Sequence, residues 1–84
     1  MNHPFVIEKS RDAAKRLLDM KDLSEPDRIN LAYRETLGRL PGEQEQKLAS
    51  AFVNSSSGSQ EEQMDRWAQF YQSLFGSLDF RYVN

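Results

Sequence analysis

The chain has 84 residues, enough for one small domain and too few for a second hydrophobic core. Its 11 Lys and Arg residues against 13 Asp and Glu residues give a formal net charge of -2, which argues against nucleic-acid binding through a basic surface. The chain has no Cys, so disulfides, thiolate zinc sites, thiol nucleophiles and covalent haem attachment within it are excluded. No apolar run reaches the roughly 20 residues that span a bilayer, so we expect no membrane insertion.

Helix-breaking residues divide the chain into segments of helical length. The first helix is expected from Pro4 to about Met20, because Pro suits the first turn and apolar residues follow at three- and four-residue steps. The second is expected from Glu25 to Leu37. Ser24 can cap its start, and Gly38 can supply the left-handed residue that commonly ends a helix.

The third helix is expected from about Gly42 to Val53 and has the weakest pattern, with a narrow apolar edge at Leu48, Ala51 and Phe52. We expect it to depend on the other helices for most of its stability, since an isolated helix of this length is marginal in water.

The fourth helix is expected from Gln60 to Phe75, ahead of Gly76, and contains the single Trp, Trp67. Residues 77–83 then alternate between apolar and polar. A two-residue period predicts an extended tail along the bundle, and a further short helical turn is the alternative.

These short amphipathic helices must bury their apolar stripes against one another. We therefore predict an all-α fold, in which residues 1–84 form one compact four-helix bundle with orthogonal or antiparallel neighbours and a short extended or helical C-terminal tail. Trp67 is expected at the centre. The expected core comprises the bulky apolar residues of all four helices: Phe5, Val6, Leu17, Leu18, Ile29, Tyr33, Leu37, Leu48, Phe52, Met64, Trp67, Tyr71, Leu74 and Phe75.

The sequence shows no set of residues that suits catalysis. His3 is the only His and has no neighbour that would complete a metal site or an acid–base pair. The turn from Gly38 to Gly42 suggests a helix-turn-helix, but the following helix begins with Glu43 and Glu45, which would repel phosphate. We predict no catalytic, cofactor or metal site, and hence no enzyme.

Arg39 stands between Gly38 and Pro41, six residues before Glu45. Its guanidinium can pair with Glu45 or donate to carbonyls at the end of the helix, which would fix the corner between the second and third helices. An exposed Arg that binds an anion is the alternative. We favour the structural corner.

Several segments, taken in order, resemble one family. Met1-Asn2-His3-Pro4-Phe5-Val6, with Ala13-Ala14 and Arg16-Leu17-Leu18, resembles its Leu-Asn-x-x-Phe-Val opening and the Ala and Arg-Leu that follow. Leu37-Gly38-Arg39-Leu40-Pro41 with Glu45 is similar to its Leu-Gly-Arg-x-Pro-Thr-x-x-Glu, and Trp67, Ser73-Leu74-Phe75, Asp79-Phe80 and Tyr82-Val83 resemble its closing motif. The family is that of the large multidomain planctomycete proteins often labelled planctomycete cytochrome C, whose C-terminal module is a domain of unknown function.

Two departures from the family pattern concern Gly42 and Asp79. Gly42 stands where the family tends to have Thr or Ser, so the third helix is expected to start less firmly. Asp79 replaces a Glu, which is a mild change.

The resemblance implies that the chain is the C-terminal module of a larger, exported protein. Many relatives attach haem in another segment, but haem cannot be carried over because no matching Cys exists here. We predict a non-catalytic module that packs against or positions neighbouring domains or another protein. Its interaction surface is expected to be an apolar patch that includes Phe70, Phe80 and Tyr82.

Two alternatives stay open. The module could lend residues to a composite active site of the full-length protein, polysaccharide-related or redox, with Arg39, Trp67, Tyr71 and Tyr82 as contributors. It could also be an adaptor that binds a peptide helix in a groove between the first and fourth helices.

Overall fold

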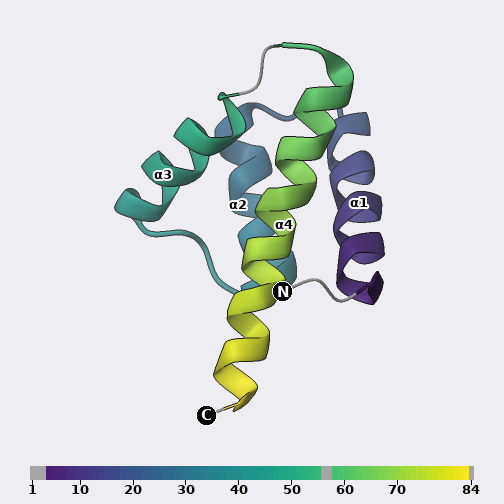
Figure 1. Ribbon diagram of the computed structural model, residues 1–84. Coiled ribbons are helices and arrows are strands. Elements are labelled where there is room, and N and C mark those ends of the chain that lie inside the picture. Colours follow the sequence, from purple (N-terminus) through teal and green to yellow (C-terminus); the bar gives the residue numbers. More distant parts are fainter. Residues whose placement is uncertain (1–3, 56–57, 84) are drawn as a thin grey trace.

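Four α-helices make up most of the computed structural model, which describes residues 4–55 and 58–83, with side chains as far as residue 77 (Figure 1). No strand occurs in these ranges. The predicted all-α four-helix bundle is therefore confirmed. The helices are α1 (Pro4–Asp19), α2 (Glu25–Leu37), α3 (Glu43–Val53) and α4 (Gln60–Val83).

The ends of α2 follow the local signals in the sequence. The hydroxyl of Ser24 accepts a hydrogen bond from the backbone N–H of Asp27 at 3.3 Å and so caps the helix. Gly38 adopts a left-handed conformation with φ of 70°, and its N–H donates to the carbonyl of Arg34 at 3.2 Å. A residue with a Cβ would be strained at that φ, so Gly38 fixes where the chain turns towards α3.

The C-terminal segment differs from the extended tail that the alternating pattern favoured. α4 continues without a break through Gly76 and ends at Val83. A single Gly costs a helix interior only about 1 kcal/mol relative to Ala, which a long helix can absorb. The hydroxyls of Ser73 and Ser77 donate to the carbonyls of Phe70 and Ser73 on this stretch. Ser77, the first polar residue of the alternating segment, is thus accommodated on a helix.

α4 is the central element of the bundle. It packs against each of the other three helices, most extensively against α1, which lies beside it and runs in the opposite direction (Figure 1). α3 crosses obliquely on the other side, and the C-terminal end of α4 extends past the other helices. The hydrophobic core accordingly forms along α4.

The indole of Trp67 lies at the centre of this core, as predicted, with 2% of its surface exposed. Tyr71, Leu17 and Ile29 are also fully buried and come from α4, α1 and α2. The rings of Trp67 and Phe70 form a T-shaped pair, with centroids 5.6 Å apart. One aromatic cluster on α4 is therefore shared by the helices around it.

Four aromatic or aliphatic residues lie elsewhere than predicted. Phe5, Leu48 and Phe52 are exposed, whereas Phe70, expected on the surface, is buried. Phe5 precedes Val6 by one residue, a turn of about 100° on the helix, which carries it away from the buried face of α1. Phe70 follows Trp67 at three residues and so shares its face.

Replacing Trp67 with Ala should remove the centre of the core. We expect a loss of about 3–5 kcal/mol, against a total stability on the order of 5 kcal/mol for a domain of this size. Thermal unfolding followed by circular dichroism should then show a strongly lowered melting temperature, with a sizeable unfolded fraction already at 25 °C if the loss is at the upper end of this range. Gln69→Ala, at an exposed position two residues away, is the control and should melt like the parent. Trp67→Ala protein that melts at the parental temperature would contradict the core.

Candidate interaction site between α2, α3 and α4

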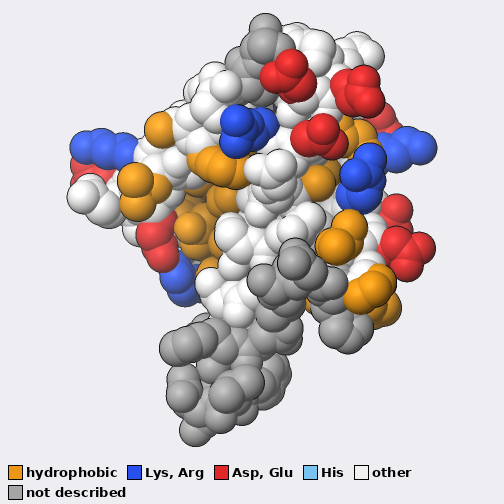
Figure 2. All heavy atoms as spheres, viewed as in Figure 1, with side chains coloured by type: hydrophobic (Ala, Val, Ile, Leu, Met, Phe, Trp, Pro, Cys, Tyr) orange, Lys and Arg blue, Asp and Glu red, His pale blue; other side chains and the backbone are white. Residues whose placement is uncertain are grey.

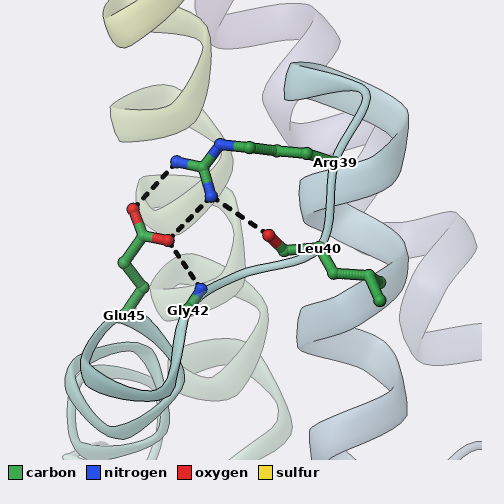
Figure 3. Close-up of polar contacts among 4 residues, drawn as sticks. All are labelled: Arg39, Leu40, Gly42 and Glu45. Carbon is green, nitrogen blue, oxygen red and sulfur yellow. Dashed lines mark hydrogen bonds and ion pairs between the residues drawn. The ribbon is translucent and has the colours of Figure 1, made fainter.

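The corner between α2 and α3 is fixed by a two-pronged ion pair (Figure 3). The Nη1 and Nη2 atoms of Arg39 donate to Oε1 and Oε2 of Glu45 at 2.8 and 2.9 Å. Nη1 also donates to the backbone carbonyl of Leu40 at 3.0 Å, within the connecting loop. The Glu45 pair that the sequence suggested is therefore present, whereas the carbonyl that Arg39 reaches belongs to the loop and not to a helix end. The Arg39 side chain is half exposed. The flat guanidinium matches the carboxylate in a way that a Lys ammonium could not.

Glu45 also stabilises the first turn of α3. Its Oε1 accepts the backbone N–H of Gly42 at 2.8 Å, the interaction that a capping-box Glu makes. Gly42 has no side chain with which to cap the helix, so we expected a weak start. The structure shows that the same carboxylate that pairs with Arg39 supplies a contact at the start of α3.

These contacts change the acid–base behaviour of the corner. The hydrogen bonds from Arg39, and then from Gly42, lower the pKa of Glu45 from 4.5 to about 2. The guanidinium of Arg39 also lies over the ring of Tyr33, 5.5 Å from its centroid. Burial, and then the charge of Glu45, raise the pKa of the Tyr33 hydroxyl. Both groups thus keep one charge state through the neutral range.

Beside this corner lies an apolar groove, which we call the α3 groove. It is a pocket of about 270 Å³ with walls from α2, α3 and α4. Figure 2 shows hydrophobic side chains gathered in the hollow between α3 and α4. The lining residues are Tyr33, Glu45, Leu48, Ala49, Phe52, Gln69, Phe70 and Ser73.

The groove is open because α3 turns a different face towards the core than the sequence suggested. The sequence suggested that Leu48, Ala51 and Phe52 face the core, but Ala49 and Val53 are the buried residues of α3. Their small side chains let the helix approach the bundle closely. Leu48 therefore stays 69% exposed and Phe52 36% exposed, at the lip of the groove.

Glu25, for which the sequence carries no local signal, helps to set the rotation of α3. Its Oε1 accepts hydrogen bonds from the Ser50 hydroxyl at 2.6 Å and the Asn54 side-chain amide at 3.0 Å. The start of α2 is thereby joined to the end of α3. The partners are 25 and 29 residues away along the chain, so no local spacing signals them.

The other predicted site residues do not gather at the groove. Trp67 and Tyr71 are buried, and the Tyr71 hydroxyl donates to Oε1 of Glu35 at 2.9 Å. Burial, and then the charge of Glu35, raise the pKa of Tyr71. Glu35 also forms an ion pair with Arg16 at 2.9 Å. The side chains of Phe80 and Tyr82 lie outside the described part of the structure.

A second hollow lies where the adaptor alternative expected one. It is a pocket of about 390 Å³ between α1 and α4, closed on one side by the end of α2. Val6 and Phe75 contribute apolar surface, while Arg16 and Glu35 place an ion pair in the lining. This hollow is more polar in its residues than the α3 groove.

Among the side chains that the structure describes, no group of three His, Cys, Asp or Glu residues could hold a metal ion. None of the helices, within the same part of the chain, is long and apolar enough to cross a membrane. Comparisons of the chain with protein-family models, with curated proteins and with solved structures find no match.

Glu45→Gln should remove part of the acid sensitivity of the fold. A carboxyl whose pKa is lower in the folded state stabilises the fold above its unfolded pKa, and this contribution is lost as the pH falls from 4.5 towards about 2. Urea unfolding at a series of pH values should therefore show a steeper loss of stability for the parent than for Glu45→Gln.

Glu43→Gln is the matched control, because Glu43 makes only a 3.9 Å contact with Lys47 at the surface. It should keep the parental pH dependence. Equal acid sensitivity in the parent and in Glu45→Gln would show that the Arg39–Glu45 corner does not hold the folded state together.

Proposed function

We propose that this domain is a non-catalytic interaction module, which packs against and positions neighbouring domains of a larger exported planctomycete protein. The α3 groove is the observation that carries the proposal. The family resemblance in the sequence supports the place of the domain in a larger protein, and the groove supports its role there.

The apolar residues of α3 favour a partner surface over a purely solvated one. Leu48 is 69% exposed beside a groove whose floor includes the buried rings of Tyr33 and Phe70. A large exposed aliphatic side chain next to an apolar hollow is typical of a contact site, because burying both removes apolar surface from water. Single exposed apolar residues occur on any protein, but here Leu48 and Phe52 both lie at the lip of the groove.

Polar contacts at the rim hold the groove in shape. The Arg39–Glu45 pair closes one side, and the guanidinium of Arg66 lies over the ring of Phe52, 5.2 Å from its centroid. These contacts orient α3 and Phe52 before a partner arrives. A pre-formed groove loses less conformational entropy on binding than one that has to be ordered.

The end of the α4 backbone is a second candidate for the same role. Its backbone continues as a helix beyond the other three helices (Figure 1), and this stretch contains Phe80 and Tyr82. Both residues were assigned to the interaction surface from the sequence. A helix that projects from a bundle can pack against another domain.

A composite active site receives less support. Its suggested aromatic contributors Trp67 and Tyr71 are buried in the core, and both terminal nitrogens of Arg39 already donate to Glu45. The described geometry therefore does not place Arg39 beside exposed aromatic rings, which is the arrangement that would favour such a site.

Leu48→Asn should separate the interaction role from stability. Since Leu48 is exposed, the isolated 84-residue domain should keep its free energy of unfolding within about 0.5 kcal/mol. In the longer protein that carries this domain, the α3 amides should exchange their hydrogens more slowly than they do in the isolated domain, which is an additional protection. Leu48→Asn should remove that additional protection.

Ala51→Asn is the matched control, because Ala51 is exposed on α3 but does not line the groove. It should leave the additional protection in place. If α3 exchanges at the same rate in the longer protein and in the isolated domain, the groove does not contact a neighbouring domain and the proposal fails.

A further inference from the structure

A positively charged pocket lies at the end of the bundle where α1 ends and α2 and α4 begin. Its volume is about 200 Å³, and its lining shares no residue with the α3 groove. Three cationic side chains line it, Lys15 on α1, Lys21 in the following loop and Arg28 on α2. The three cations thus come from separate segments and meet around one hollow.

The charges of the residues that line this pocket do not cancel. Asp19 is the only acidic residue in the lining, which leaves a formal charge of +2 in a chain whose net charge is -2. Within the described side chains, no carboxylate lies within ion-pair distance of Lys15, Lys21 or Arg28. An anion would supply the missing counter-charge.

Arg28 is held in place at this pocket. Its Nη2 donates to the backbone carbonyl of Met20 at 3.1 Å, while its Nε is buried and has no hydrogen-bond partner. A partly buried charge without a counter-ion is costly, and a nearby anion would lower that cost. Because Nε is shielded, we assign the direct contacts to the exposed ammonium groups and the long-range attraction to the guanidinium.

The first turn of α4 completes the wall. Gln60 and Gln63 line the pocket, and their side-chain amides can donate hydrogen bonds. The N-terminal end of this helix also carries the positive end of its dipole. The acidic residues Glu61 and Glu62 belong to the same turn but are not part of the lining.

We infer that this pocket binds a doubly charged tetrahedral oxoanion, a phosphate or sulfate group. The charge of such a group matches the formal +2 of the lining, and its several oxygens can accept from cations that approach from different segments. The group can be a free phosphate or sulfate ion, or a phosphate monoester on a larger molecule. The inference is independent of the α3 groove and of the proposed packing role.

The test is a titration of the ¹⁵N-labelled protein with inorganic phosphate and with sulfate at constant ionic strength. We expect saturable shifts at the amides that surround Lys15, Lys21 and Gln60, with a Kd of about 1 mM or tighter. The double variant Lys15→Gln/Lys21→Gln should weaken binding by about tenfold or more, since two of the three cations are removed.

The control is Lys9→Gln/Lys47→Gln, which changes the net charge equally at exposed positions outside the pocket. It should bind like the parent. Equal weakening in both double variants, shifts that do not saturate, or acetate binding as tightly as phosphate would each overturn the inference.

A parallel titration with phosphoserine distinguishes the two sources of the group. Tighter binding of phosphoserine than of inorganic phosphate supports an ester on a larger molecule, and the reverse order supports a free ion.

Discussion

The burial of one indole on the central helix is the constraint on which the rest of the structure depends. Trp67 lies on α4, the helix that contacts each of the others, and it is almost fully shielded from water. Helices as short as α2 and α3 gain little stability on their own, so their order derives from this shared core. The surfaces considered for binding all border the same central helix.

The way α3 joins the bundle explains why an apolar groove is left open. α3 contacts the core through Ala49 and Val53, and polar contacts to Glu25 and Arg39 fix its rotation. Larger side chains at the core-facing positions would have pushed the helix outward and filled the space. The small contact residues therefore bring α3 close, while its larger apolar residues remain at the surface and are available to a partner.

Much of the fold followed from local signals in the sequence. Ser24 and Gly38 marked the ends of α2, and the six-residue spacing of Arg39 and Glu45 indicated the corner pair. Local patterns could not give the rotation of α3, because Leu48 and Phe52 have helical spacing whether they face the core or the groove. That choice depends on long-range contacts such as those of Glu25. The alternation after Gly76 suggested a strand-like tail. The preceding part of α4 is long enough for the helix to continue, and the backbone is helical as far as Val83.

The single Trp of the chain allows its central position to be measured directly. Fluorescence of Trp67 in the folded protein should be blue-shifted relative to indole in water and resistant to quenching by acrylamide. During urea unfolding, this shielding should be lost in the same transition that removes the helical circular dichroism signal, as expected for one cooperative core. Water-like emission with free quenching while the helices are still intact would contradict the account.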